Sequence, residues 1–347
     1  MVEFALFSKL SEVFGVPGRE DGIQELMLSE FKKIGLKAET DRMGNVIAKG
    51  KGARKNPLVL AAHMDEIGMM VKYITEKGFL KFIKVGGIDN RTLLNQRVVV
   101  QTKNGNIYGV IGSKPPHLMK DEEMKNAIDK KNLFIDIGAK NRKDAEKLGV
   151  QVGDAVCFDM KMQKLANGIV TGKAIDDRVG CYILLEAAKM LKDKNVVFVG
   201  TVQEEVSTFG KGAQVSAYSL EPSAFIAIDT AIAGDHPEVG EEEAPLKLGA
   251  GPAITAVEAS GRGNVADRLL LKEVMETAKK AKVKYQLEVI EGGATDAASV
   301  YNVRGGIPSV ALCVPTRYIH SNVQVCALSD VEKTLELVVE IGKKGVR

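Results

Sequence analysis

The pattern of apolar and polar positions changes character twice along the chain. Residues 20–33 place apolar side chains such as Ile23, Met27 and Phe31 three or four positions apart, which predicts an amphipathic helix. A continuous apolar run follows at 57–62, and such a run is typical of a strand buried on both faces of a parallel sheet. The N-terminal segment therefore predicts alternating helices and strands.

Between about residues 68 and 164 the pattern is that of a β-rich domain. Short strand-like pieces are separated by turn signals, including Gly86-Gly87 and Asn104-Gly105-Asn106. These pieces lie at Met69–Tyr73, Phe79–Lys84, Arg97–Gln101 and Ile107–Ile111. Only one helix is expected here, around residues 143–147. We therefore expect a small, separate β-rich domain in this part of the chain.

The alternation of helices and strands returns after residue 165. The periodicity predicts helices at 176–192, 264–282 and 329–343, and buried strands at 195–202, 224–228 and 309–314. The simplest fold class is α/β, with one domain built from residues 1–67 and 165–347. Residues 68–164 would then be inserted into this discontinuous domain.

Composition and charge exclude several classes of protein. The chain has 347 residues with 48 basic and 45 acidic side chains, and a net charge of +3 is too small to indicate nucleic acid or a membrane surface as a partner. Its apolar runs are far shorter than the ~20 residues of a membrane span, and its N-terminus does not resemble a signal peptide. Four scattered cysteines form no CxxC pair and are typical of reduced thiols, so we expect a cytoplasmic location.

Histidines and carboxylates follow the predicted strands at their carboxyl ends, where α/β sheets bind ligands. These residues are His63, Asp65, Glu204, Glu205, Asp229 and His320, and Asp176 lies at the start of a predicted helix. Each has an ordinary structural explanation when taken alone, such as helix capping for Asp176. The joint pattern is harder to explain in this way and predicts one site.

Imidazole and carboxylate ligands together favour zinc, cobalt or manganese. Two such ions sharing one carboxylate would activate a water and stabilise negative charge on a carbonyl oxygen. The adjacent residues Glu204 and Glu205 suit a division of roles, in which one binds metal and the other accepts a proton from the water. The carboxylate of Asp65 could accept a hydrogen bond from the imidazole nitrogen of His63 that faces away from the metal.

Several motifs resemble those of the tetrahedral (TET) aminopeptidases, which are cytosolic co-catalytic metallopeptidases. They are HMDEIG at 63–68, GKAIDDRVG at 172–180, TVQEEV at 201–206, AIDTAIAGDHP at 227–237 and PTRYIHS at 315–321. The likeness covers essentially the whole chain, including VGGIDNRTLLNQRV at 85–98 and GGATDA at 292–297. It implies a zinc-aminopeptidase-like α/β/α catalytic domain in which residues 68–164 form a dimerisation domain.

The resemblance also implies residue roles. Asp176 would bridge two divalent metal ions per subunit, with His63 and Asp229 at one ion and Glu205 and His320 at the other. Glu204 would be the general base and Asp65 the partner of His63, while Asp177 would be structural. Asp296, Arg317 and Tyr318 would either touch substrate or support the site.

The implied activity is the removal of N-terminal residues from short peptides by a metal-bridged hydroxide, with dimers assembling into a tetrahedral dodecamer. The sequence does not indicate which side chain is preferred at the N-terminus of the peptide substrate. Three departures from the family pattern concern the pocket more than the chemistry: a longer loop at 206–213, Asn322 in place of a usual proline, and Ile88 in place of a frequent aromatic residue.

Two other functions have to be weighed. Some relatives of the family have been labelled endoglucanases, and glycoside hydrolysis also uses two carboxylates. The absence of tryptophan and an aromatic content of 5% argue against a carbohydrate site. A non-catalytic scaffold would be expected to have lost metal ligands, and this sequence keeps the whole set.

Overall fold

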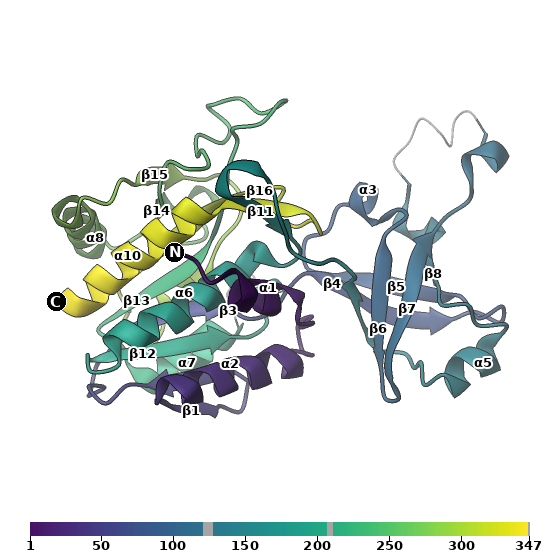
Figure 1. Ribbon diagram of the computed structural model, residues 1–347, viewed down its shortest axis with the longest axis horizontal. Coiled ribbons are helices and arrows are strands. Elements are labelled where there is room, and N and C mark those ends of the chain that lie inside the picture. Colours follow the sequence, from purple (N-terminus) through teal and green to yellow (C-terminus); the bar gives the residue numbers. More distant parts are fainter. Residues whose placement is uncertain (121–127, 207–210, 346–347) are drawn as a thin grey trace.

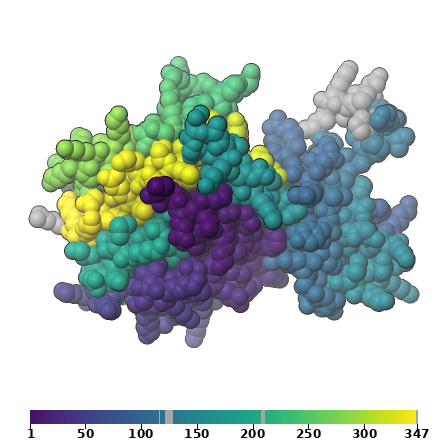
Figure 2. Space-filling view, viewed as in Figure 1, coloured from purple at the N-terminus to yellow at the C-terminus, as the bar shows by residue number. Residues whose placement is uncertain are grey.

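The computed structural model describes residues 1–120, 128–206 and 211–345, which form an 11-stranded sheet with its helices and a closed β-barrel. The barrel strands come from the middle of the sequence. In Figure 1 the barrel lies to the right of the α/β part, and Figure 2 shows it protruding from the larger body. This arrangement is the mixed α/β fold class expected from the sequence.

The centre of the large sheet is parallel. It consists of β12 (Val196–Thr201), β3 (Leu58–His63), β13 (Ala224–Ile232) and β16 (Ser309–Arg317), in that order across the sheet. Every residue of β3 and β12 is buried, as the apolar patterns at 57–62 and 195–202 predict. Parallel pairing places the carboxyl ends of these strands along one edge of the sheet.

The remaining strands of the large sheet flank this centre. On one side lie β2 (Val46–Lys49) and β1 (Lys37–Thr40), and on the other β17 (Gln324–Ala327), β11 (Ile169–Gly172) and β10 (Gln163–Lys164). Off this path, β14 (Ala253–Val257) pairs with both β16 and β15 (Gln286–Val289). Because β10 pairs with β11, residues 163–164 belong to the large sheet and not to the insertion that we expected to reach residue 164.

Helices cover both faces of the large sheet. One face carries α1 (Phe4–Glu12), α2 (Asp21–Ile34), α6 (Ile175–Leu191), α8 (Arg268–Ala281) and α10 (Leu328–Lys344), and the other carries α7 (Lys211–Leu220) and α9 (Asp296–Val300). Alternate strand residues supply the two cores: Leu60 faces the α6 side, whereas Val59 faces the α7 side. The helices expected at 20–33, 176–192, 264–282 and 329–343 are all confirmed.

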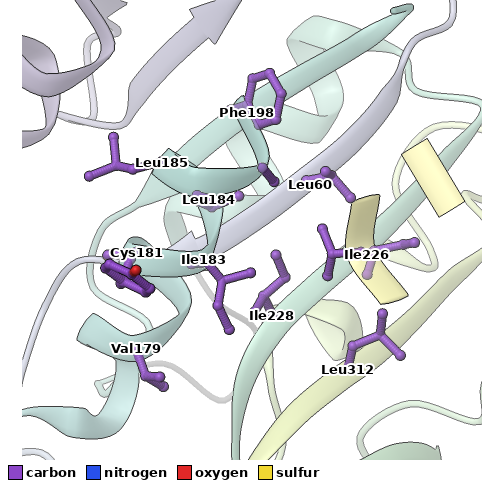
Figure 3. Close-up of a cluster of buried hydrophobic side chains, with 14 of the residues drawn as sticks. Leu60, Val179, Cys181, Ile183, Leu184, Leu185, Phe198, Ile226, Ile228 and Leu312 are labelled. Atoms are coloured by element: carbon purple, nitrogen blue, oxygen red, sulfur yellow. The ribbon is translucent and has the colours of Figure 1, made fainter. Parts of the chain in front are cut away.

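Helix α6 is the central element of the larger core. Its side chains Val179 and Ile183 pack over the sheet with Leu60, Phe198 and Ile226 (Figure 3). Burying one such aliphatic or aromatic side chain stabilises a fold by about 1.5–3 kcal/mol. The helix is therefore held firmly against the sheet, and its first turn, which contains Asp176, lies close to the strand ends.

The barrel is closed by six strands in the order β4-β5-β8-β7-β6-β9. These strands are β4 (Gly68–Ile74), β5 (Leu80–Val85), β6 (Arg97–Thr102), β7 (Gly105–Gly112), β8 (Phe134–Asp136) and β9 (Ala155–Phe158), with short helices α3 (Asn90–Leu93) and α5 (Arg142–Lys147). The barrel has a core of its own, which includes Met69, Val98, Ile135 and Val156. The β-rich character and the helix near 143–147 agree with the sequence pattern, whereas the four-residue helix α3 was not expected.

Two further features bear on the sequence analysis. In the described part of the chain, no helix combines the length and the apolar character that crossing a membrane requires. All four cysteines, namely Cys157, Cys181, Cys313 and Cys326, are buried and free of disulfide bonds.

Candidate metal centre

The candidate residues converge at the carboxyl edge of the parallel strands. His63 is the last residue of β3, Asp229 lies within β13, and Glu204 and Glu205 follow the end of β12. His320 lies three residues beyond β16, and Asp176 lies in the first turn of α6. The strand expected to end at residue 228 continues to Ile232, so Asp229 points from inside a strand and not from a loop.

Asp176 lies between the two histidines. Its Oδ1 atom is 3.1 Å from Nε2 of His63, and its Oδ2 atom is 3.6 Å from Nε2 of His320. Asp229 Oδ1 lies 3.8 Å from the same nitrogen of His63, and Glu205 Oε2 lies 3.3 Å from that of His320. The structure thus brings these five residues together, with a single carboxylate facing both imidazoles.

Among the residues that the structure describes, two sets of three are compact enough to share an ion. In His63, Asp176 and Glu205, one nitrogen or oxygen atom from each lies within 4.8 Å of the others, and the same holds for His63, Asp177 and Asp229. The carboxylate of Asp177, however, already accepts hydrogen bonds from the backbone N–H groups of His63 and Gly180, at 3.2 Å and 3.0 Å. Those bonds favour the structural role that we expected for Asp177.

Asp65 contacts the site in two ways. Its backbone carbonyl lies 3.1 Å from Nδ1 of His63, closer than its carboxylate oxygen Oδ1 at 3.7 Å. Both carboxylate oxygens instead accept backbone hydrogen bonds, Oδ1 from Glu204 at 3.0 Å and Oδ2 from Glu205 at 3.1 Å. The carboxylate therefore fixes the two glutamates, a contact that the sequence pattern alone did not predict.

Glu204 occupies a different position from its neighbour. Its Oε2 atom lies 4.0 Å from Nε2 of His63, and it belongs to neither compact set. Burial raises the pKa of Glu204 well above its usual range, and the negative charges of Asp229 and Asp296 add to the shift. Burial also raises the pKa of Glu205 and that of Asp229.

The histidine pKa values also reflect the negative environment. Burial lowers the pKa of His63, but hydrogen bonds to Asp176 and Asp65 outweigh it, so that this pKa lies well above its usual value. Burial lowers the pKa of His320, but its hydrogen bond with Glu205 and the negative charges of Glu205 and Asp176 together raise this pKa to about 9. The site therefore attracts positive charge.

The donor set fits divalent transition-metal ions. Two imidazoles and several carboxylates are the ligand types that zinc, cobalt and manganese accept. Within the described residues, the buried Oε1 atom of Glu205 has no hydrogen-bond partner, which is costly for a polar atom unless a cation or water satisfies it. Buried carboxylates in this number also need more positive charge than the two histidines supply.

The three possible substrate contacts differ in their surroundings. Asp296 is buried, accepts a 2.5 Å hydrogen bond from Thr201 Oγ1, and has a pKa that burial raises to about 6. Arg317 forms a two-pronged ion pair with Asp235, at 2.8 Å and 2.7 Å. Tyr318 is 47% exposed. The ion pair favours a supporting role for Arg317, whereas the Tyr318 ring, whose centroid lies 5.2 Å from that of the His236 ring, remains exposed enough to contact a ligand.

Two further residues that the sequence did not predict as site residues contact the site. The side chain of Gln324, in β17, accepts a 2.8 Å hydrogen bond from the backbone N–H of Asp176. Gly87, which belongs to the segment before the barrel strand β6, lies directly against the ring of His320. A lone glutamine or glycine has no periodicity that could have revealed these contacts. Of the loop at 206–213, residues 207–210 lie outside the described part of the chain.

Comparison with known proteins agrees with this geometry. The sequence profile of the family described as M42 glutamyl aminopeptidase matches residues 44–337. A protein of Acetivibrio thermocellus named "Putative aminopeptidase" is 40% identical over 97% of both chains, and the "Lysyl aminopeptidase" of Pyrococcus furiosus is 32% identical over 97% of this chain and 96% of its own.

Solved structures agree as well. The Pyrococcus horikoshii TET1 peptidase, whose title says that it can assemble into a tetrahedron or a large octahedral shell, superimposes with a TM-score of 0.87 and 36% identity over 98% of each chain. The family profile covers far more than half of this chain, and the relatives cover nearly all of it. This chain is therefore a member of the M42 glutamyl aminopeptidase family.

Proposed function

We propose that this protein is a metal-dependent aminopeptidase that removes N-terminal residues from short peptides. The observation that carries the proposal is Asp176, whose two carboxylate oxygens face the imidazoles of His63 and His320 separately. His63 and Asp229 would hold one divalent ion, Glu205 and His320 the other, and Asp176 both. Zinc is our first choice for the metal, with cobalt or manganese as alternatives that the same ligands accept.

Bound divalent ions supply Lewis acidity, which polarises a peptide carbonyl and lowers the pKa of water. The proton transfers fall to Glu204. Its Oε2 atom lies 4.0 Å from Nε2 of His63, and because Glu204 is not one of the five proposed ligands, its carboxylate would be free to accept a proton from the attacking water. Glu204 would then give this proton to the leaving amine, as general acid–base catalysis requires. Positive charge in the site would lower its raised pKa towards the working range.

Three finer features belong to the proposal. The two relatives reported above are both named aminopeptidases, but one name specifies lysyl and the family name specifies glutamyl, so the side-chain preference is open to test. We propose a homo-oligomer, as large as a tetrahedral dodecamer, by analogy with the P. horikoshii peptidase. We also propose a cytoplasmic location, which is supported by four buried cysteines that form no disulfide.

The test uses protein stripped of metal by a chelator and refilled with zinc, cobalt or manganese. Each sample is assayed on a panel of aminoacyl fluorogenic substrates, on the same substrates with an acetylated N-terminus, and on a cellulosic substrate. We expect hydrolysis only with metal and only of substrates with a free amine. Full activity in protein shown to be metal-free by elemental analysis would contradict the proposal, and metal-dependent cellulose hydrolysis would favour the glycoside hydrolase alternative.

A further inference from the structure

The turn that carries His320 has a backbone conformation that needs external support. Tyr318 and His320 have φ angles of 58° and 61°, in the left-handed region that side chains with a Cβ rarely adopt. Residues in this region cost free energy and persist where surrounding contacts hold them. Within the turn, Ser321 Oγ donates a 2.7 Å hydrogen bond to the carbonyl of Tyr318, but this bond alone does not fix the turn against the rest of the molecule.

The inserted segment makes one of the external contacts. Asn322, which is 9% exposed, donates a 2.7 Å hydrogen bond from Nδ2 to Oε1 of Gln96. Gln96 immediately precedes β6 of the barrel, and its backbone carbonyl accepts a 2.9 Å hydrogen bond from the N–H of Ile111 in β7. Gln96 is therefore anchored through its backbone to the barrel and not to the sheet that supplies the other candidate ligands.

Gly87 makes a second contact with the same turn. A Cβ atom at this position would lie 2.7 Å from Nδ1 and 3.1 Å from Cε1 of His320, which is closer than real Cβ contacts allow. Gly87 does not have a positive φ, so space and not backbone conformation requires glycine here. The other ring nitrogen, Nε2, faces Glu205 and Asp176 at 3.3 Å and 3.6 Å.

We propose that Gln96 and Gly87 are positioning residues for His320, so that the inserted segment completes the proposed metal site in addition to any role in assembly. Gly87 sets how far the ring can withdraw from Glu205 and Asp176, and Gln96 holds the turn through Asn322. The inference rests on the proposed function because it takes His320 as a metal ligand. Outer contacts that orient a ligand typically change metal affinity by 10–100-fold when they are removed.

The first experiment compares Gly87→Ala with Gly305→Ala. An added Cβ meets no heavy atom within 4 Å at Gly305, and this glycine also lacks a positive φ, so the two variants make the same chemical change in different surroundings. Metal-free protein is titrated with zinc while binding heat and ion stoichiometry are measured. We expect Gly87→Ala to reduce the affinity for one of the two zinc ions by about tenfold or more. The affinity for the other ion, and both affinities in Gly305→Ala, should stay close to those of the wild type.

The second experiment tests the amide pair without changing side-chain size. In Gln96→Glu the new carboxylate still accepts from Asn322, and in Asn322→Asp the amide of Gln96 can turn to donate. The double variant places two carboxylates at the same 2.7 Å contact and cannot form the bond. We expect the affinity for the more weakly bound ion to fall by less than about threefold in each single variant. In the double variant, the affinity should fall by a factor larger than the product of the two single-variant factors.

The inference would be overturned if Gly87→Ala bound zinc with the same affinities as Gly305→Ala. It would also be overturned if the loss of zinc affinity in the double variant of Gln96 and Asn322 equalled the product of the losses in the two single variants. A folded wild-type chain that binds zinc but gains no peptidase activity would contradict the proposed function alone, since the positioning effect is measured by binding. Wild-type protein that binds no divalent ion would overturn both. Circular dichroism on every variant separates a displaced ring from a failure to fold.

Discussion

Asp65 Oδ1 accepts a 3.0 Å hydrogen bond from the backbone N–H of Glu204, although the two residues are 139 positions apart. The other carboxylate oxygen accepts from Glu205 at 3.1 Å, so a fully buried carboxylate holds both glutamates through their backbone. Hydrogen bonds to a charged acceptor are stronger than neutral ones, and both are lost if the carboxylate moves. The position of Glu204 therefore depends on Asp65 and not only on the strand that precedes it.

Replacing Asp65 by asparagine should loosen the two glutamates. Asparagine keeps one acceptor oxygen and turns an N–H group towards the second backbone N–H, so at least one of the two bonds is lost. We expect kcat/KM to fall by about 10–100-fold, with weaker binding of at least one metal ion. Asp136→Asn is the matched control, because Asp136 also accepts a backbone hydrogen bond, from Gly138, but lies at the end of β8 in the barrel. Equal activity in both variants would contradict the role of Asp65.

Glu204→Gln separates the proposed base from the proposed ligands. Glutamine keeps the size of the side chain but cannot accept the proton, so kcat should fall by about 10²–10⁴-fold while both metals remain bound. Glu205→Gln should instead lose or weaken one metal ion. Metal content and kcat are measured on the same samples. Metal loss in Glu204→Gln with metal retained in Glu205→Gln would exchange the two proposed roles. Near-normal turnover in Glu204→Gln would exclude the mechanism.

The ion pair between Arg317 and Asp235 should stabilise the turn that leads to His320. It is partly buried and two-pronged, and Arg317 lowers the pKa of Asp235 below its usual range. Asp235→Asn should reduce the free energy of unfolding by about 1.5–3 kcal/mol, since hydrogen bonds to charged groups are worth about that much. Denaturant unfolding measures the change.

The exposed pair of Arg304 and Glu221 provides the control for that experiment. Glu221→Gln should cost less than about 1 kcal/mol, because solvent screens surface ion pairs. If Arg317 acts instead on substrate, Arg317→Lys should raise KM while the free energy of unfolding stays unchanged. That result would restore the substrate contact considered from the sequence.

Glu258 should make stability depend on pH. Burial raises its pKa from 4.5 to about 7, although Thr295 donates it a 2.7 Å hydrogen bond. The folded state then keeps its proton while the unfolded state has lost it, so the stabilisation is complete below pH 4.5 and disappears as the pH rises to about 7. The expected loss is about 3 kcal/mol across this window.

Glu258→Gln removes this titration because glutamine stays neutral. Its stability relative to wild type should therefore increase between pH 4.5 and pH 7.5, as measured by unfolding at several pH values. The same replacement at the exposed residue Glu242 is the control. A difference between Glu258→Gln and wild type that does not vary with pH would show that this carboxyl group does not titrate in the window.

The protein should form a particle several times larger than its 37.4 kDa chain. The barrel contributes none of the proposed metal ligands, and side chains such as Tyr108, at 70% exposure, place apolar surface on its outside. Light scattering should detect the assembly, and deletion of residues 68–158 should reduce it to much smaller species. A uniform monomer at micromolar concentration in the intact chain would contradict the proposed oligomer.

Sequence patterning predicted most of the fold. The spacing of Ile23, Met27 and Phe31 gave the helix that became α2, and the run at 57–62 gave the buried strand that ends at His63. Both signals are local, because a helix repeats its buried face every 3.6 residues and a strand buried on both faces is a continuous apolar run, and each pattern is visible in any single sequence. The end of the insertion was less well predicted, since the two-residue strand at 163–164 is too short to show a period.

The sequence by itself determined the set of residue types at the site, because the residues that follow parallel strands all lie at the same edge of the sheet. Only the tertiary structure decided how these residues meet. Three contacts join segments that are far apart in the sequence. Asp176 lies between two imidazoles, Asp65 accepts hydrogen bonds from a distant backbone segment, and Gly87 contacts His320. Such contacts depend on how helix α6, the sheet and the barrel pack against one another, and periodicity carries no information about the distance between elements once they are packed.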